Sequence, residues 1–322
     1  MSSAGVTAVT IGNFDGVHLG HAALVRRCRE LAGPGRVTVL SFDPHPLTLL
    51  RPQSAPPRLS TFDQRHDYLK SLGADEVLRL TPDPALLNKS AREFIEWLVA
   101  THRPRFVVEG DDFHFGKGRA GNNATLRALG PELGFDLDIV PPVEVPLGDD
   151  LIVRASSSVL RWLITHGRVD DAARVLGRPY ELIGTVTKGD QRGRTIGYPT
   201  ANLATDCLLP ADGVYAAYAT LPTGDKLSAA INIGTRPTFN GTHRRLEAHL
   251  LDATNLPLDH YNWPIKIHLI AWVRPDLTFD DIPTLVTQID RDCTRVRDLL
   301  ALHERRPIPR PHSFLRTQGT TA

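Results

Sequence analysis

The sequence predicts two unlike domains, the first with α/β architecture and the second an antiparallel β-barrel or sandwich that ends in a helix. Three observations support this prediction. A chain of 322 residues has room for roughly two domains of the usual size. Up to about residue 177, short apolar runs alternate with helical stretches, which is typical of βαβ units and a parallel sheet. Beyond that point, apolar runs separated by turn residues follow one another, which is typical of antiparallel sheets.

The first half contains five apolar runs that we expect to form parallel strands flanked by helices. One helix is predicted over 22–32, where apolar residues recur at helical spacing. Another is predicted over 91–100, because Ser90 and Glu93 form a capping-box pattern directly before it. The predicted strands are 6–11, 37–42, 77–80, 106–109 and 137–140.

The second half predicts an antiparallel sheet closed by one amphipathic helix. The helix covers 280–300, where an apolar stripe indicates packing against the sheet. We place the domain boundary after Gly177, so that the domains span 1–177 and 178–303. Residues 304–322 are polar and contain prolines, and we expect a disordered tail there. The predicted strands are 182–187, 213–220, 227–233, 246–251 and 265–273.

The composition indicates a protein whose partners are small molecules. Lys and Arg number 37 against 36 Asp and Glu, a net charge of +1, so no basic field attracts nucleic acid or an anionic membrane. Cys28, Cys207 and Cys293 are odd in number and scattered, which argues against a disulfide framework and fits a reducing compartment. No apolar run approaches about 18 residues, and the N-terminus lacks a signal-peptide pattern. We expect a cytoplasmic monomer or weak homo-oligomer with no nucleic-acid or membrane partner.

The most informative stretch is 11–21, which places two histidines three residues apart where an apolar strand leads into a helix. His18 and His21 lie at the first turn, where free backbone N–H groups and the helix dipole favour phosphate oxygens. Two imidazoles there can donate hydrogen bonds to a phosphorus centre as negative charge builds, and Gly20 lets the backbone approach a ligand. For the pair alone, a helix N-terminus with two half-exposed rings is the simpler interpretation. A zinc site is disfavoured, because paired cysteines or a nearby acidic ligand are missing.

Other candidate site segments follow the predicted strands, because ligands of an open parallel sheet bind beyond the carboxyl ends of its strands. These segments are 43–46 and 110–116. A serine run over 156–158, followed by Arg161, offers hydroxyls and a guanidinium at a second helix start, although such a run is most often only a cap.

The string from Gly12 to His21 resembles the nucleotide-binding motif of the nucleotidylyltransferase superfamily, in particular the adenylyltransferase half of the bacterial riboflavin kinase/FMN adenylyltransferase (FAD synthetase) family. Segments 41–46, 108–116 and 155–161 resemble further motifs of that family, which implies a Rossmann-like domain with a parallel sheet and flanking helices. The residues implied are His18, His21 and Arg161 for catalysis, Gly12, Asn13, Phe14, Asp15, Gly20, Ser157 and Ser158 for ATP and phosphate, and His45, Asp112 and Phe113 for flavin.

Several of these positions have simpler interpretations or depart from the family pattern. Asp15 can merely form a turn with the glycine that follows it, and His45 between two prolines can merely form a rigid turn. Glu109 replaces an apolar residue, so that its side chain either faces solvent or alters the pocket. Ala155 replaces an isoleucine.

The second half carries its own phosphate-binding pattern over 188–202. Gly189, Gly193 and Gly197 recur every four residues and give a backbone whose N–H groups can cradle phosphates. Thr200 and Asn202 place a hydroxyl and an amide oxygen two residues apart, which suits Mg²⁺. The chain contains no P-loop motif, so ATP binding here must use another arrangement.

This run closely resembles the riboflavin kinase pattern, in which a Pro-Thr-Ala-Asn segment coordinates Mg-ATP. Residues 232–239 and 246–252 resemble two further blocks of that kinase and imply a β-barrel domain with Glu247 as general base. Without the resemblance, Glu247 is more simply a residue on the solvent-facing side of a strand, with Leu246 and Ala248 pointing inward. The other residues implied are Gly189, Arg192, Gly193, Gly197, Pro199, Thr200 and Asn202 for ATP, with Thr200 and Asn202 also holding the metal, and Arg236 for flavin.

The resemblance therefore implies two activities that share ATP as co-substrate and Mg²⁺ as cofactor. The second domain is expected to phosphorylate riboflavin to FMN, and the first to adenylylate FMN to FAD with release of pyrophosphate. Two alternatives stay open at this point: an adenylyltransferase whose second domain only binds a ligand, and a flavin-binding regulator or carrier that has lost one or both activities.

Overall fold

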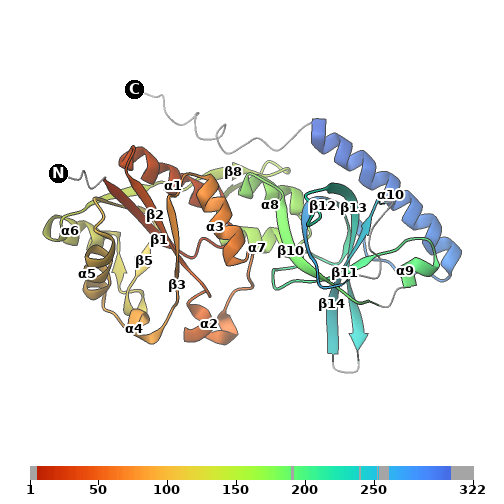
Figure 1. Ribbon diagram of the computed structural model, residues 1–322, viewed down its shortest axis with the longest axis horizontal. Helices are drawn as coiled ribbons and strands as arrows, with labels where there is room; N and C mark the ends of the chain where they lie inside the picture. The colour runs from red at the N-terminus through yellow and green to blue at the C-terminus, as the bar shows by residue number, and fades with distance from the viewer. Residues whose placement is uncertain (1–5, 190–191, 239–240, 252, 254–260, 306–322) are drawn as a thin grey trace. The chain divides into compact units, whose positions relative to one another are not determined.

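The computed structural model describes residues 6–189, 192–238, 241–251, 253 and 261–305 (Figure 1). The contacts between residues divide the chain into two compact units, which we describe separately. Unit 1 comprises residues up to 57, 62–144 and 154–156, and unit 2 comprises 58–61, 145–153 and the residues from 157 onward. The sequence predicts a disordered tail over 304–322, but Glu304 and Arg305 belong to the last helix, and residues 306–322 lie outside the described residues.

Unit 1 is built on a five-stranded parallel sheet with the strand order β3-β2-β1-β4-β7, which confirms the predicted α/β architecture. Helices α1 and α3 pack on one face through Val25, Cys28 and Leu69, and α5 and α6 pack on the other face (Figure 1). The strands are β1 (Thr7–Gly12), β2 (Arg36–Phe42), β3 (Glu76–Leu80), β4 (Phe106–Gly110) and β7 (Asp136–Val140), and the helices are α1 (Leu19–Ala32), α3 (Phe62–Ser71), α5 (Ala91–His102) and α6 (Asn123–Leu133).

Helix α5 begins where the sequence predicts, because the Ser90 side chain accepts from the Glu93 N–H and the Glu93 carboxylate accepts from the Ser90 N–H. The shorter elements lie in the connections. They are α2 (Leu47–Leu50), α4 (Pro84–Leu87), β5 (His114–Phe115), β6 (Gly121–Asn122), β8 (Glu144–Pro146), β9 (Ile152–Arg154) and two 3₁₀ turns, Pro52–Ser54 and Lys117–Arg119.

The strand order reverses between β1 and β4, which is where open parallel sheets bind ligands. Six residues of β1 pair with β2, but only Ala8 and Val9 pair with β4. The ladder between β1 and β4 therefore stops before either strand ends. The loops that follow these two strands begin three residues beyond the last pair.

Glu109 occupies the place where the ladder stops. Its side chain neither faces solvent nor lies at the surface, since Glu109 is 1% exposed and its Oε1 accepts a hydrogen bond from the Ile11 N–H at 2.8 Å. The carboxyl group thus satisfies a β1 donor that has no strand partner. Burial raises the pKa of Glu109 well above its usual value, and the hydrogen bond from Ile11 opposes that shift.

Unit 2 is a closed barrel with the strand order β10-β11-β14-β13-β12-β15, which confirms an antiparallel barrel. Alternate residues along its strands fill the interior, and among them Leu246, Ala248 and Leu250 are buried as predicted. The strands are β10 (Tyr180–Thr187), β11 (Ala201–Ala204), β12 (Gly213–Thr220), β13 (Lys226–Thr238), β14 (Gly241–Leu250) and β15 (Pro264–Pro275), and the helices are α7 (Ser157–Thr165), α8 (Val169–Leu176), α9 (Arg192–Thr195) and α10 (Ile282–Arg305).

Helices α7 and α8 group with the barrel by their contacts, although the sequence places the boundary after Gly177. One face of α8 is fully buried, and α8 contacts β10 and β15. The Ala211 N–H donates to the carbonyl of Ile164 at the end of α7. The position of the boundary between two independent domains remains the proposal made from the sequence.

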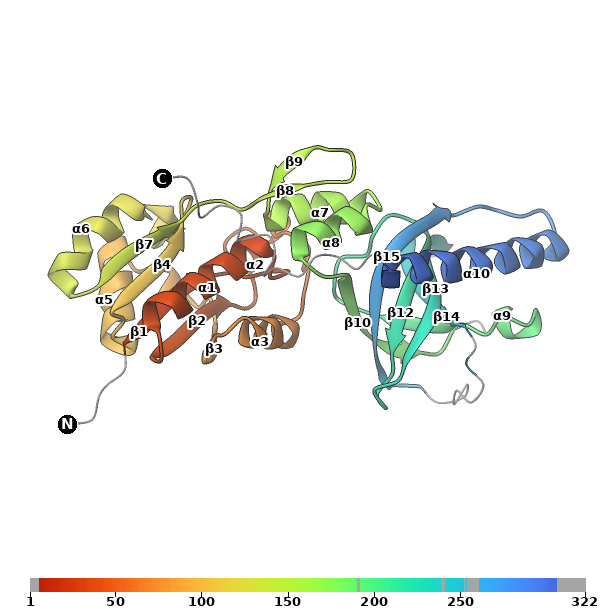
Figure 2. The ribbon, with the colours of Figure 1, turned by 90° about the horizontal axis from the view of Figure 1, so that it is seen from above.

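Helix α10 packs along the outside of the barrel against β12, β13 and β15 (Figure 2). Cys293, Val296 and Leu300 form its buried stripe, as the sequence predicts. A salt bridge adds to this packing: Arg274 of β15 donates through Nε to Asp292 at 2.9 and 3.0 Å, and the two side chains are 16% and 7% exposed. The Gln288 amide also donates to Asp292 at 2.8 Å.

Asp292→Ala is expected to destabilise unit 2 by about 3–5 kcal/mol, because Arg274 loses its carboxylate partner in a largely buried setting. Urea unfolding of the variant and the wild type measures the difference. Asp298→Ala, which removes an exposed carboxylate from the same helix, is the matched control and should change stability by less than about 0.5 kcal/mol. Equal losses for the two variants would contradict the role given to the salt bridge.

Glu109→Gln is expected to stabilise unit 1 increasingly as the pH rises above about 4.5, the usual pKa of a glutamate. Because the folded-state pKa of Glu109 is raised, its protonation supports the fold at low pH, and this contribution is lost as the pH rises toward the raised pKa. Glutamine keeps an oxygen for the Ile11 N–H and binds no such proton. The variant's advantage in free energy of unfolding should grow by up to about 1.4 kcal/mol per pH unit. Urea unfolding at several pH values measures it, and a pH-independent difference would argue against a raised pKa.

Candidate active sites of the two units

In unit 1, the loop between β1 and α1 is held in an unusual backbone conformation. Phe14, Gly16 and Val17 have φ values of 49°, 83° and 43°, in the left-handed region that favours glycine. Phe14 and Val17 are nonetheless buried, and the Val17 N–H donates to the Phe14 carbonyl at 3.0 Å. A Cβ atom at Gly12 would lie 3.3 Å from the Phe14 ring. Core packing of two apolar side chains thus compensates the backbone strain and fixes the loop.

The two predicted histidines are brought together at the end of this loop. His18 is the N-cap of α1, and its Nδ1 accepts from the His21 N–H at 3.4 Å. The two rings stack with their centroids 3.6 Å apart, and Phe14 lies 5.0 Å from His21. A Cβ atom at Gly20 would lie 3.1 Å from the His18 ring and 3.2 Å from the Ala155 carbonyl. Glycine at this position therefore leaves room for the imidazole and for the chain segment at Ala155.

Arg65 of α3 is a site residue that the sequence did not reveal. It is 3% exposed, and its Nη1 donates to the carbonyls of Asn13 at 2.7 Å and Phe42 at 2.8 Å. Its Nη2 forms an ion pair with Asp43, which is also buried. One guanidinium thus ties the loop after β1 to the loop after β2.

The loop after β2 carries His45, which lies beside the first loop. His45 Nδ1 accepts from the Leu47 N–H at 3.1 Å, and its Nε2 lies 3.3 Å from Asn13 Nδ2. The structure therefore places two predicted residues, Asn13 and His45, within hydrogen-bond distance. His45 is more than a turn residue, because its ring links two loops.

The segment after β4 presents its acidic residues at the surface. The Asp112 side chain is 77% exposed and lies 3.3 Å from Arg154, which also pairs with Asp111. Phe113 stacks on Phe115 with ring centroids 5.4 Å apart. Phe113 thus rests on a buried aromatic ring, whereas the Asp112 carboxylate lies at the surface beside Arg154.

The serine run continues from this unit into the next. Ala155 is buried, and its N–H donates to the Val143 carbonyl at 2.8 Å. Ser157, Ser158 and Arg161 lie in the first turns of α7, which is grouped with unit 2. Their cooperation with His18 and His21 remains a prediction.

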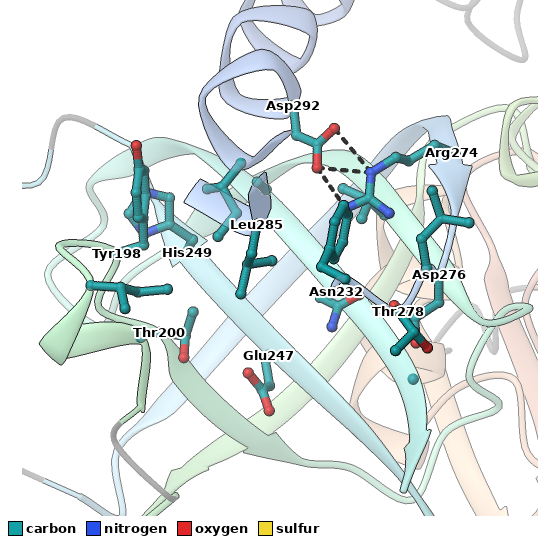
Figure 3. A pocket seen from close by; sticks show the side chains of 18 of the residues that line it. Tyr198, Thr200, Asn232, Glu247, His249, Arg274, Asp276, Thr278, Leu285 and Asp292 are labelled. Carbon is teal, nitrogen blue, oxygen red and sulfur yellow. Dashed lines mark hydrogen bonds and ion pairs between the residues drawn. The ribbon is translucent and has the colours of Figure 1, made fainter. Parts of the chain in front are cut away.

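In unit 2, a cavity of about 640 Å³ lies between the outer faces of β13 and β14 and helix α10 (Figure 3). This size is typical of small-molecule sites. Residues of the barrel line one side, and apolar residues of α10 such as Leu285 and Ile289 line the other. Segment 276–281, which connects β15 to α10, completes the wall. The sequence did not predict this wall.

Glu247 lies in the centre of a row of three polar residues. It is the register partner of Asn202 on β11 and of Asn232 on β13. Directly opposed residues in neighbouring strands project from the same face of a sheet. Glu247, Thr200 and Asn232 line the cavity, with Glu247 between the other two in Figure 3. The outer face of β14 is therefore a cavity wall, not merely a solvent-facing surface.

The glycine-rich run is fixed against this row. A Cβ atom at Gly189 would overlap the Asn202 amide, and one at Gly193 would overlap the Tyr198 carbonyl. Gly197 has a φ of 87°, which also favours glycine. The three glycines are thus required by close contacts or by backbone conformation.

Two tethers hold the end of the run in place. His249 Nδ1 lies 2.9 Å from the Pro199 carbonyl, which places Thr200 at the edge of the cavity. The Tyr198 hydroxyl donates to Asp290 of α10, and this hydrogen bond raises the pKa of Tyr198 to about 12. The side chains of Arg192 and Arg236 lie outside the described residues. The backbone of Arg192 begins α9, and the backbone of Arg236 pairs with that of His243 on β14.

Two family models match the chain in the order of the two units. The model described as FAD synthetase matches residues 1–152, and the model described as riboflavin kinase matches residues 176–300. The curated protein "Bifunctional riboflavin kinase/FMN adenylyltransferase" of Escherichia coli K12 is 38% identical over 300 residues, which cover 91% of this chain and 93% of that protein. The protein of the same name from Haemophilus influenzae is 34% identical and covers 88% and 91%.

A solved structure has a similar fold over most of the chain. The "Macrolide-efflux Protein from Streptococcus pneumoniae" is 29% identical, with a TM-score of 0.82, and the match covers 92% of this chain and 95% of that one. In the described part of the chain, no helix has the length and apolar character needed to cross a bilayer. The two family models and the curated relatives agree with the motifs in both units. The chain belongs to the family of bifunctional riboflavin kinases/FMN adenylyltransferases.

Proposed function

We propose that this chain makes FAD from riboflavin in two steps. Unit 2 transfers the γ-phosphoryl group of ATP to riboflavin and gives FMN and ADP. The adenylyltransferase site then transfers AMP from a second ATP to FMN and gives FAD and pyrophosphate. The observation that carries this proposal is that the histidines and the glutamate implied for catalysis lie in different units of the fold, in the stacked pair at the start of α1 and in the row centred on Glu247.

In the kinase step, Glu247 accepts the proton of the terminal ribityl hydroxyl while that oxygen attacks the γ-phosphorus of ATP. The bond from the γ-phosphorus to the bridging oxygen of ADP breaks in line with the attack. We assign to the cavity wall from α10 the role of limiting access by water, which would otherwise compete as the acceptor. The backbone at Gly189, Gly193 and Gly197, with Arg192 and Pro199, holds the triphosphate.

Thr200 and Asn202 fit a Mg²⁺ ion by their chemistry and their surroundings. The hydroxyl oxygen of Thr200 and the amide oxygen of Asn202, together with the phosphates, are the ligands we propose. The fit of Gly189 against the Asn202 amide keeps that amide in place. When bound, Mg²⁺ neutralises charge on the β- and γ-phosphates.

In the adenylyl step, a phosphate oxygen of FMN attacks the α-phosphorus of ATP and pyrophosphate leaves. His18 and His21 donate hydrogen bonds to the phosphate oxygens, and the first N–H groups of α1 add to that stabilisation. Gly12, Asn13, Phe14, Asp15 and Gly20 form the loop that receives the nucleotide. Ser157, Ser158 and Arg161 bind the leaving phosphates, and His45, Asp112 and Phe113 contact flavin. Arg236 contacts flavin in the kinase step.

The remaining parts of the proposal concern the setting of the reaction. We place the enzyme in the cytoplasm as a monomer or weak homo-oligomer. No observation favours a regulator or carrier without activity. Incubation of the protein with riboflavin and Mg-ATP, followed by chromatographic separation of riboflavin, FMN and FAD, tests both activities together. Binding of flavin without any product would support the carrier instead.

His21→Ala is expected to lower FAD formation from FMN by on the order of 10²-fold or more, because the transition state loses a preorganised donor. Riboflavin phosphorylation should stay within about twofold of the wild type. His66→Ala, which removes an exposed histidine of α3, is the matched control and should change neither rate. If the folded His21 variant lost both activities, the two sites would not be independent.

Glu247→Gln is expected to produce the opposite pattern. The amide keeps the shape of the side chain and cannot accept the hydroxyl proton, so kcat for riboflavin phosphorylation should fall by about 10²-fold or more. Adenylylation of added FMN should be unaffected. Steady-state assays of each half-reaction measure this, and an unchanged kinase rate would exclude Glu247 as the general base.

A further inference from the structure

One polar atom in the unit 2 cavity is left without a hydrogen-bond partner. The Oδ1 atom of Asn232 is buried and accepts no hydrogen bond from the residues that the structure describes. An unsatisfied buried acceptor destabilises the folded state. Asn232 nevertheless lines the cavity beside Glu247. A buried acceptor of this kind, placed at a reaction site, suggests that its partner arrives with the substrate.

The surroundings of Asn232 restrict the chemistry of that partner. Glu247 is its register partner, and Asp276 approaches the same stretch of β13, where a Cβ atom at Gly234 would lie 2.9 Å from Asp276 Oδ2 and 3.9 Å from Asn232 Nδ2. Arg245 and Arg274 also line the cavity, so charge alone does not exclude a phosphate group here. An amide oxygen only accepts hydrogen bonds, however, and a fully ionised phosphate has no proton to donate to it. A neutral hydroxyl group, which can donate to Oδ1 without adding negative charge, fits best.

The strand order separates the two reactants. Strands β11 and β13 pair with opposite edges of β14, so Asn202 and Asn232 flank Glu247 on opposite sides. The glycine-rich run lies against Asn202, which assigns the β11 side to the phosphates. The β13 side is then left for the acceptor. Directly opposed residues have Cβ atoms about 4.5–5.5 Å apart, so groups close together on one substrate chain can reach both.

We propose that Asn232 binds the flavin substrate through its polyol chain, with Oδ1 accepting a hydrogen bond from a secondary hydroxyl near the terminal hydroxyl that Glu247 deprotonates. This inference rests on the kinase activity proposed above. It makes Asn232 a positioning residue, since it orients the chain and exchanges no proton with the reacting oxygen.

The test compares riboflavin with three analogues that retain the terminal hydroxyl and lack one of the secondary hydroxyls. Calorimetry measures flavin binding by the wild type and by Asn232→Ala, without dependence on turnover. The variant should bind riboflavin about tenfold more weakly. The wild type should bind one of the analogues about tenfold more weakly than riboflavin. Wild type and variant should bind that analogue with equal affinity. If Asn232→Ala lowered the affinity for riboflavin and for all three analogues by the same factor, the proposal would be overturned.

Stability without ligand gives a second readout. Asn232→Leu replaces the unsatisfied amide by an apolar group of similar shape, so the melting temperature of the free protein should stay the same or rise. The upward shift produced by saturating riboflavin should shrink. A lower melting temperature of the free variant would indicate a structural role for the amide and would contradict the proposal.

Two further measurements separate this inference from the proposed function. If Asn232 were a cation ligand, the Ala variant would need more Mg²⁺ for half-maximal activity, and that outcome would overturn the substrate contact. A wild type that neither binds nor phosphorylates riboflavin would refute the proposed function itself. A wild type that does both, with an Ala variant that binds riboflavin equally well, would refute only the role of Asn232.

Discussion

The register of β14 against its two neighbours is the constraint on which the second unit depends. Side chains alternate between the faces of a strand, so a slip of one residue would move Glu247 into the barrel interior and expose Leu246. Pairing with β11 and β13 is continuous through this region, and the buried partners Leu203, Leu246 and Ile233 fill the interior directly beside the polar row. Core packing thus fixes the register, and the register brings Asn202 and Asn232 to Glu247, from which they are 45 and 15 positions away in the sequence.

In the first unit, the equivalent constraint is an interruption of strand pairing. The β1–β4 ladder ends early, and two buried ionisable residues stabilise the ends of these strands and the loops that follow them. Glu109 satisfies the Ile11 N–H, and Arg65 binds backbone carbonyls from two loops. In both cases, a side chain supplies the hydrogen-bond partner that a backbone group would otherwise find in a neighbouring strand. The phosphate-binding loop can therefore adopt left-handed backbone angles without leaving the strand ends unsatisfied.

The sequence predicted the features that depend on local pattern. The capping box at Ser90, the position of His18 and His21 at a helix start, and the inward alternation around Glu247 follow from residues close together in the chain, and the structure has each of them. The parallel sheet and the barrel followed from the rhythm of apolar runs. In each case, the spacing of apolar residues or the chemistry of a helix cap was enough to predict the feature.

Features that depend on long-range packing were not predicted. Arg65 is an arginine in an amphipathic helix with no local signal of burial, and its role depends on where β1 and β2 end. Asn232 was noted only as part of a family block, and its importance depends on the pairing of β13 with β14. The burial of Glu109 could not be predicted from the sequence. A strand buried on one face and a strand buried on both faces can show the same residues around a single position. The grouping of α7 and α8 with the barrel likewise depends on tertiary contacts.

The placement of α10 has a consequence for how the protein is made. The glycine-rich run, Glu247 and Asn232 all precede residue 251, yet the wall that closes their cavity comes from residues 276–293. A nascent chain would therefore carry every group assigned to phosphoryl transfer before it could enclose a substrate. Only after synthesis of the helix, and its docking through Arg274 and Asp292, would riboflavin meet a shielded site, so translation itself sets the order in which this half matures.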